Sequence, residues 1–146
     1  MTMQALAGHI FAVANETGRS ITNLQLQKIL FFSLGLHLRL RGGIDQLAQE
    51  IYNLPFSKWR YGPVVEDLYF TYNGYGSQPI IPQVANRDPR FEHLDTAIIN
   101  LLDRDVFKLV SFSHQMSAWD DFKDDILEGR HVDPYTLDEI FTDFTE

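Results

Sequence analysis

The chain has 146 residues, of which 45% are apolar and 22% are charged, as in ordinary globular proteins. This length and composition predict one domain over residues 1–146 with one core, and they exclude a disordered or collagen-like chain. Twelve Lys and Arg against twenty Asp and Glu give a formal net charge of −8, which disfavours nucleic acid as a partner. The absence of Cys excludes disulfides, thiolate metal sites and cysteine nucleophiles.

Two helices are predicted at the start of the chain. Apolar residues at helical spacing predict the first over residues 4–15. Thr22 and Gln25 have the capping-box pattern, so a second helix is expected to begin there and to end near Arg41, before two glycines. Apolar residues cover more than one face of this second helix, and we therefore expect it at the centre of the core.

The middle of the chain, residues 51–82, is rich in aromatic and turn-forming residues, which disfavours long helices over most of it. Alternation over residues 56–61 predicts a short strand that ends at Gly62 and Pro63. Residues 64–72 return to helical spacing. Residues 80–84 are compatible with a second short strand, which Pro82 would confine to an edge.

Four further helices are predicted in the last third of the chain. Cap-and-proline pairs begin two of them, over residues 88–102 and 134–144. A break at residues 103–105 begins a short helix that runs through His114, and Ser117 is expected to cap another that runs to residue 127. The predicted fold is mainly α, a compact bundle of six to seven helices with a small β hairpin or short sheet.

Nothing in the sequence indicates export or membrane insertion, so a cytoplasmic protein is expected. The first residues lack the basic and apolar regions of a secretion signal. The most apolar run, residues 29–38, has ten residues, whereas a membrane span needs about 20. No membrane contact is predicted.

Acidic residues are concentrated at the end of the chain. Residues 1–91 carry eight basic and six acidic side chains, and residues 92–146 carry four basic and fourteen acidic ones. One interpretation is a solvated helix face, and the other is a docking area for a basic partner. Four carboxylates on one side of the predicted helix 117–127 are candidates for this surface: Asp120, Asp121, Asp124 and Asp125.

Known catalytic and metal-binding motifs are absent from the sequence. There is no phosphate-binding glycine loop, no paired-histidine helix, no nucleophile elbow and no calcium loop. We therefore predict no metal, no cofactor and no enzymatic activity. An enzyme built around His114, Tyr61 and the acidic helix is kept as a third hypothesis.

Eight aromatic residues fall within 24 positions, which favours a local core and a binding surface about equally. They are Tyr52, Phe56, Trp59, Tyr61, Tyr69, Phe70, Tyr72 and Tyr75. Lys58, Arg60 and Tyr72 are added to the candidate partner-binding surface. Because a buried amine needs an acceptor, we expect Lys28 to reach outward or to meet a carboxylate or carbonyls.

The order of short motifs carries a resemblance. Leu26-Gln27-Lys28 is followed by Trp59-Arg60-Tyr61-Gly62-Pro63-Val64 and then by Ser113-His114. This order, over about residues 4–130, resembles the Panacea domain family, which includes SocA-like and GepA-like phage-associated proteins. The matched positions, structural or partner-contacting, are Lys28, Trp59, Tyr61, Gly62, Pro63, Tyr69, Tyr75, His114 and Trp119.

The resemblance implies an antitoxin that neutralises a protein toxin encoded by the neighbouring gene through direct binding. Some relatives look like adaptors that deliver a toxin to a cytoplasmic protease, which is the alternative function. A homo-oligomer is compatible with either function. We expect Trp59 and Tyr61 to pack toward the second helix from one strand face, and His114 and Trp119 to close the core by a hydrogen bond and ring packing.

Overall fold

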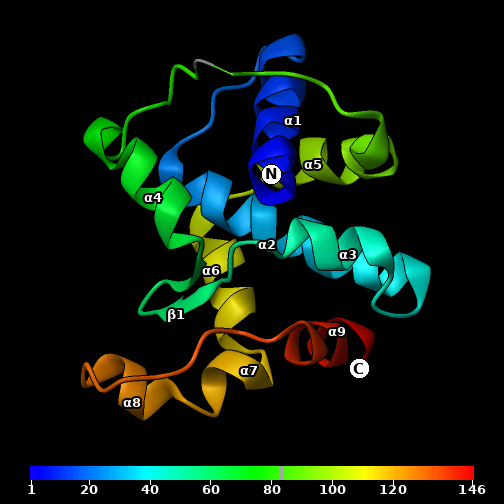
Figure 1. Ribbon diagram of the computed structural model, residues 1–146. Coiled ribbons are helices and arrows are strands. Elements are labelled where there is room, and N and C mark those ends of the chain that lie inside the picture. Colours follow the sequence, from blue (N-terminus) through cyan, green and yellow to red (C-terminus); the bar gives the residue numbers. More distant parts are fainter. Residues whose placement is uncertain (83) are drawn as a thin grey trace.

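The computed structural model describes residues 1–82 and 84–146 (Figure 1). Over these residues the chain forms nine α-helices, two short 3-10 helices and one two-stranded antiparallel sheet. The predicted mainly α fold with a small hairpin is confirmed. None of the described helices combines the length and the apolar character that crossing a bilayer requires.

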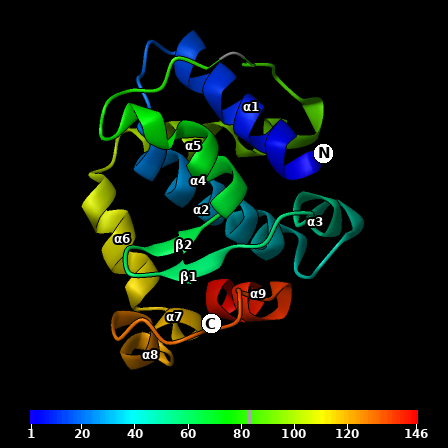
Figure 2. The same cartoon turned by 60° about the vertical axis from the view of Figure 1, so that its left-hand side comes forward.

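Helix α2 (Asn23–Arg41) is the central element, as predicted. Its capping box between Thr22 and Gln25 is present, and Gly42 ends it in the left-handed conformation with φ of 70°. It packs against α1 (Thr2–Glu16) and against five later α-helices, and Figure 2 shows α1 above it and α9 (Leu137–Thr145) below it. Most of its residues are buried, because partners cover several of its faces.

A short helix, α3 (Gln46–Ile51), was not predicted. It begins where the Asp45 carboxylate accepts a hydrogen bond from the Ala48 N–H (2.8 Å). The sheet follows, with β1 (Ser57–Trp59) antiparallel to β2 (Gly62–Val64) and Trp59 opposite Gly62. The predicted first strand is therefore confirmed only over residues 57–59, because the chain already turns at residues 60 and 61. Gly62 and Pro63, where it was expected to end, belong to its partner strand.

The second strand predicted at residues 80–84 is wrong for its described residues, and Gln83 lies outside them. A single backbone hydrogen bond, from Ile80 N–H to the Ile21 carbonyl (2.9 Å), anchors this segment to the α1–α2 connection. One such bond does not make this segment a strand of a sheet. Before this segment, α4 (Glu66–Tyr72) and the 3-10 helix η1 (Asn73–Tyr75) follow the hairpin.

The C-terminal helices differ from the prediction at two places. The 3-10 helix η2 (Pro89–Leu94) leads into α5 (Asp95–Leu102), and Asp105 caps α6 (Val106–His114), as expected. The helix predicted over 117–127 is instead two, α7 (Ser117–Asp120) and α8 (Lys123–Leu127), and Ser117 does not cap α7. Helix α9 begins at a capping box of Thr136 and Glu139, three residues after the predicted Asp133 cap.

The last helix closes the core over α2 through Phe144. Its ring centroid lies 5.5 Å from that of Phe31 and 5.7 Å from that of Phe32. Gly35 faces the same ring, and a Cβ added there would overlap it. The close approach of α9 to α2 therefore depends on a residue without a side chain.

We expect Gly35→Ala to lower the free energy of unfolding by about 1–3 kcal/mol, because overpacking must displace Phe144 from its aromatic neighbours. Urea denaturation measures the loss. Gly43→Ala is the matched control, since no atom lies within 4 Å of a Cβ built there. Equal stability of the two variants would show that α9 tolerates the shift.

Candidate protein-binding surface

The hairpin is attached to α2 by two buried polar side chains. Lys28 is fully buried, and its Nζ donates a hydrogen bond to the Pro63 carbonyl at 2.7 Å. The neighbouring Gln27 side chain accepts from the Val65 N–H at 2.9 Å. The expectation that Lys28 meets a carbonyl is thus confirmed. Helix α2 bonds the chain at Pro63, within β2, and at Val65, directly after it.

Burial has a large effect on Lys28, because a carbonyl only partly replaces the water that an ammonium group loses. Burial lowers its pKa from 10.5 to about 7. Within the described residues, no carboxylate forms an ion pair with it. The amine therefore loses its proton at a much lower pH than an exposed lysine does.

The second attachment comes from α6 and α7. Trp119 is 3% exposed, and its indole N–H donates to the Trp59 carbonyl at 2.8 Å. The His114 ring stacks on it, with centroids 3.8 Å apart and planes 16° apart. The expected ring packing is therefore present, and the hydrogen bond at this junction goes from the indole to the backbone of the hairpin.

Two details show how tightly this junction is packed. Gly62 has φ of 97°, and a Cβ there would overlap the Ser113 hydroxyl, so no other residue fits without strain. His114 Nε2 is buried without a hydrogen-bond partner among the described residues. Burial lowers the pKa of His114, so its ring is held in the neutral form.

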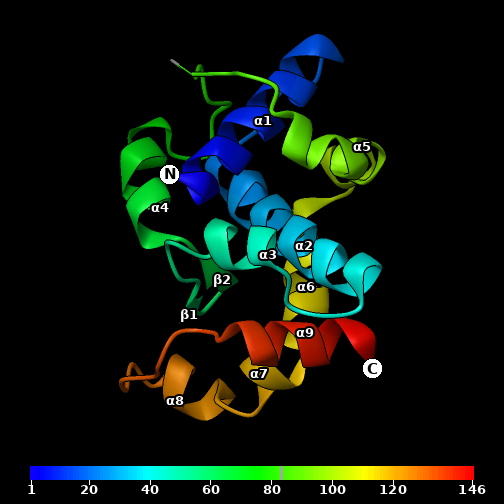
Figure 3. The same cartoon turned by 45° about the vertical axis from the view of Figure 1, so that its right-hand side comes forward.

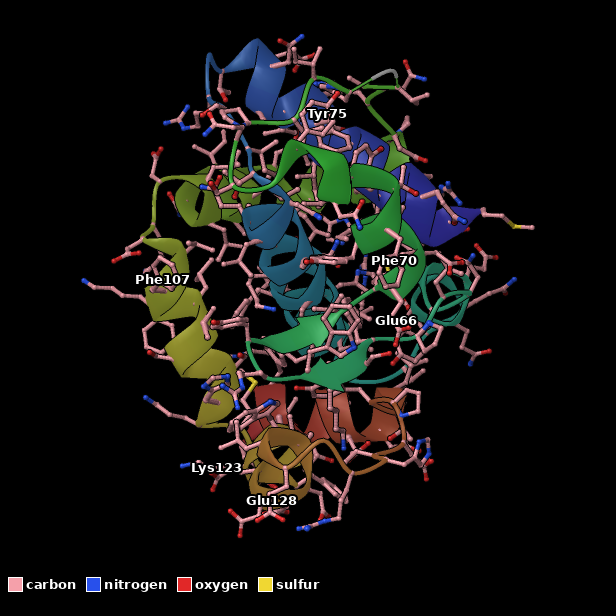
Figure 4. The ribbon with its side chains drawn as sticks, turned by 90° about the vertical axis from the view of Figure 1, so that its left-hand side faces the viewer. Glu66, Phe70, Tyr75, Phe107, Lys123 and Glu128 are labelled. Atoms are coloured by element: carbon pink, nitrogen blue, oxygen red, sulfur yellow. The ribbon has the colours of Figure 1, made fainter. Side chains whose placement is uncertain are left out.

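The outer side of the hairpin carries aromatic side chains. Trp59 lies 5.0 Å from Tyr69 and 6.1 Å from Phe70 between ring centroids. Phe70 and Tyr61 are each 56% exposed, and Figure 4 shows Phe70 on α4 beside the hairpin. We call Trp59, Tyr61, Tyr69 and Phe70 the hairpin aromatic surface.

The expectation that Trp59 and Tyr61 pack toward α2 is wrong. Strand β1 ends at Trp59, so Tyr61 lies in the turn, and the alternation of the strand turns Lys58 inward instead. Lys58 is 8% exposed, pairs with Glu139 at 3.0 Å, and its Nζ lies 4.0 Å from the centroid of the Phe122 ring. Its assignment to a partner-binding surface is therefore also wrong.

The other aromatic and basic candidates divide between core and surface. Phe56 is fully buried, and the half-buried Tyr72 packs against Phe11 with centroids 5.3 Å apart, so Tyr72 serves the core more than a surface. The half-buried Tyr75 donates its hydroxyl to the Ile81 carbonyl at 3.0 Å. Arg60 is exposed in the turn beside Tyr61.

The acidic candidates are at the surface but not on one helix. Asp120 ends α7, Asp121 lies in the break, and Asp124 and Asp125 are on α8. The single acidic helix face is therefore wrong, because the chain turns after Asp120. Asp125 pairs with Arg130 at 2.6 Å, which partly neutralises this end of the molecule.

Sequence analysis missed a chain of hydrogen bonds through His37. This fully buried side chain lies 2.9 Å from the Asp45 carboxylate through Nε2, and its Nδ1 lies 2.8 Å from His93 Nε2. Burial, reinforced by His37, lowers the pKa of His93. Asp45 shortly follows two glycines, which is typical of the start of a new helix, whereas no residue near His93 in the sequence indicates a partner on α2. Within the described ranges, no group of three or more His, Asp or Glu side chains is arranged to hold a metal ion.

Lys28→Met is expected to remove a pH dependence of stability. The folded pKa lies below the ordinary one, so the unfolded chain binds more protons between pH 7 and 10.5. The stabilising contribution is complete above pH 10.5, falls progressively as the pH is lowered from 10.5 to 7, and is absent below that range. Urea denaturation at pH 7 and 9.5 should show a rise in stability for the natural chain and for the exposed control Lys108→Met, but not for Lys28→Met. A rise that persists in Lys28→Met would contradict this account.

The two tryptophans should differ in how much stability is lost when each is replaced by Ala. Trp119→Ala removes a buried ring and a hydrogen bond, and we expect a loss of about 3–5 kcal/mol. Both tryptophans look like core residues from the sequence, but the half-buried Trp59 packs on the outer face and should lose less. Thermal and urea denaturation of both variants measure the difference. A loss for Trp59→Ala as large as that for Trp119→Ala would place its ring in the core.

No family model matches this chain, and neither a curated protein nor a solved structure matches it. The Panacea resemblance therefore depends on the motif residues themselves. Five of those residues, Lys28, Gly62, Pro63, His114 and Trp119, meet at the attachment of the hairpin.

Proposed function

We propose that this protein is an antitoxin that neutralises a protein toxin by binding it directly through the hairpin aromatic surface. The observation that carries the proposal is the exposure of Phe70, which packs beside Trp59 and Tyr69, together with the exposure of Tyr61 in the hairpin turn. Aromatic side chains provide much of the binding energy at protein interfaces, and an exposed cluster of them is otherwise unfavourable in water.

The attachment of the hairpin supports this use. A two-stranded hairpin alone is marginally stable in water, yet this one is fixed by Lys28, Gln27 and Trp119. A surface that is rigid before binding loses little conformational entropy when the partner arrives. The aromatic rings therefore retain most of their interaction energy for the partner.

The family resemblance supports the partner class. Its motif block in this sequence, Trp59 to Val64, covers the end of β1, the turn and β2 of the hairpin. A protein toxin encoded by the neighbouring gene is the partner that this resemblance implies. Direct binding is favoured over delivery to a protease because the exposed side chains are suited to a stable interface.

The test is co-expression with the product of the neighbouring gene. The natural chain should relieve growth arrest and co-purify with the toxin at unchanged toxin level. The double variant Phe70→Ala/Tyr61→Ala should reduce rescue and co-purification at least tenfold while its denaturation midpoint stays close to that of the natural chain, because both side chains are exposed. Phe107→Ala, which alters a 62% exposed side chain on α6, is the matched control and should keep full activity.

Three results would contradict the proposal. One is growth arrest that the natural chain does not relieve. The second is full rescue by the double variant. The third is a protease-dependent fall in toxin level, which would favour the adaptor function instead.

A further inference from the structure

A second surface lies away from the hairpin aromatic surface. A groove of about 640 Å³ is lined by residues of α2, α5, α6 and α9 and their flanking loops, with an apolar floor of Phe32, Leu101, Leu109, Phe112 and Met116. It adjoins a groove of about 280 Å³ between α7 and α9, because Ser117 and Asp143 line both. Figure 3 shows α9 beside α7 at this side of the molecule. We call the two together the joined groove.

Part of the apolar floor is open to solvent, although Leu109 is buried. Phe112 is 43% exposed, and Phe32 and Met116 are half-buried. Each square ångström of apolar surface that a partner covers here contributes about 25 cal/mol. The floor therefore offers binding energy to a partner with apolar side chains.

Carboxylates dominate the rest of the joined groove. Four of them form no ion pair within the described residues: Asp121, Asp138, Asp143 and Glu146. Burial raises the pKa of Asp143, and Glu146 and Glu139 raise it further, although the Ala118 N–H donates to it at 3.1 Å. The groove contains one cationic side chain, Arg104.

We infer that the joined groove binds an amphipathic, basic helix of a partner protein. Apolar side chains on one face of that helix would cover Phe112 and Met116, and Lys or Arg side chains on the adjacent face would meet Asp143 and Asp121. Helices with anchors at positions i, i+3, i+4 and i+7 bind grooves of this kind. A second copy of the chain is a poorer occupant, because two chains of net charge −8 would bring their acidic ends together.

The inference does not depend on the proposed function, since no residue of the joined groove belongs to the hairpin aromatic surface. It predicts a site that is used by a different part of the same partner or by another protein. The two sites can be tested separately on the full chain.

The probe is a fluorescein-labelled 18-residue helical peptide of Leu and Lys, and the matched peptide has Glu in place of every Lys. Fluorescence anisotropy should give a dissociation constant at least tenfold lower for the Lys peptide. Phe112→Ser should weaken its binding at least tenfold, and Asp143→Asn, which keeps an acceptor for Ala118, at least threefold. Phe107→Ser on the same helix is the matched control and should bind as the natural chain does.

Hydrogen exchange on the complex should protect α6 and α9 and leave the hairpin unchanged. The Phe70→Ala/Tyr61→Ala variant should bind the peptide normally, which separates this inference from the proposed function. Three results would overturn the inference: no binding, equal binding by Phe112→Ser and the natural chain, or a dimer in sedimentation that Phe112→Ser dissociates.

Discussion

The structure depends on a lysine amine buried near the start of its central helix. No carboxylate among the described residues pairs with Lys28, and the Pro63 carbonyl is the acceptor it reaches. Because an unsatisfied buried amine is costly, this bond fixes the position of β2 on α2. Gln27 repeats the arrangement one residue earlier, with a neutral side chain and the Val65 N–H. The hairpin is therefore fixed to α2 by two side-chain hydrogen bonds, although the two segments are far apart in the sequence.

This arrangement separates the residues that hold the shape from the residues that face solvent. Lys28 and Trp119 bond to the hairpin backbone, and Gly62 allows it to pack closely against Ser113. Tyr61 and Phe70 are exposed and contribute little to the core. Substitutions on the outer side can therefore change binding with little effect on folding. A surface built in this way can adapt to different partners while its support stays the same.

Local signals made most of the fold predictable. The capping box at Thr22 and the cap at Asp105 define helix starts through bonds within a few residues, so the sequence contains all the information they need. Helix α9 also begins at a local pattern, the capping box of Thr136 and Glu139, although Asp133 and Pro134 give a competing signal three residues earlier. Helix α7 begins without a cap from Ser117, and its contacts include the hydrogen bond from Trp119 to the Trp59 carbonyl of the hairpin. Such contacts join distant segments and leave no local pattern.

The candidate site was predictable only in part, for the same reason. That Lys28 needs an acceptor followed from its place on an apolar helix, whereas the direction of Trp59 depended on where a three-residue strand stops. Because neighbouring residues of a strand face opposite sides, a shift of one residue in the pairing exchanges Lys58 and Trp59 between the inside and the outside. The bond between His37 and His93 needed the folded positions of α2 and η2 and had no sequence signal.

The paired imidazoles of His37 and His93 also set an acid limit on the fold. The Asp45 carboxylate accepts from His37 Nε2, which leaves His37 Nδ1 to accept from His93 Nε2. Burial and His37 lower the pKa of His93, so this junction is intact above pH 6.5 and weakens as the pH falls below it. On acidification the Lys28 attachment therefore loses its contribution first, between pH 10.5 and 7, and the end of α2 that joins α3 and η2 weakens only below pH 6.5.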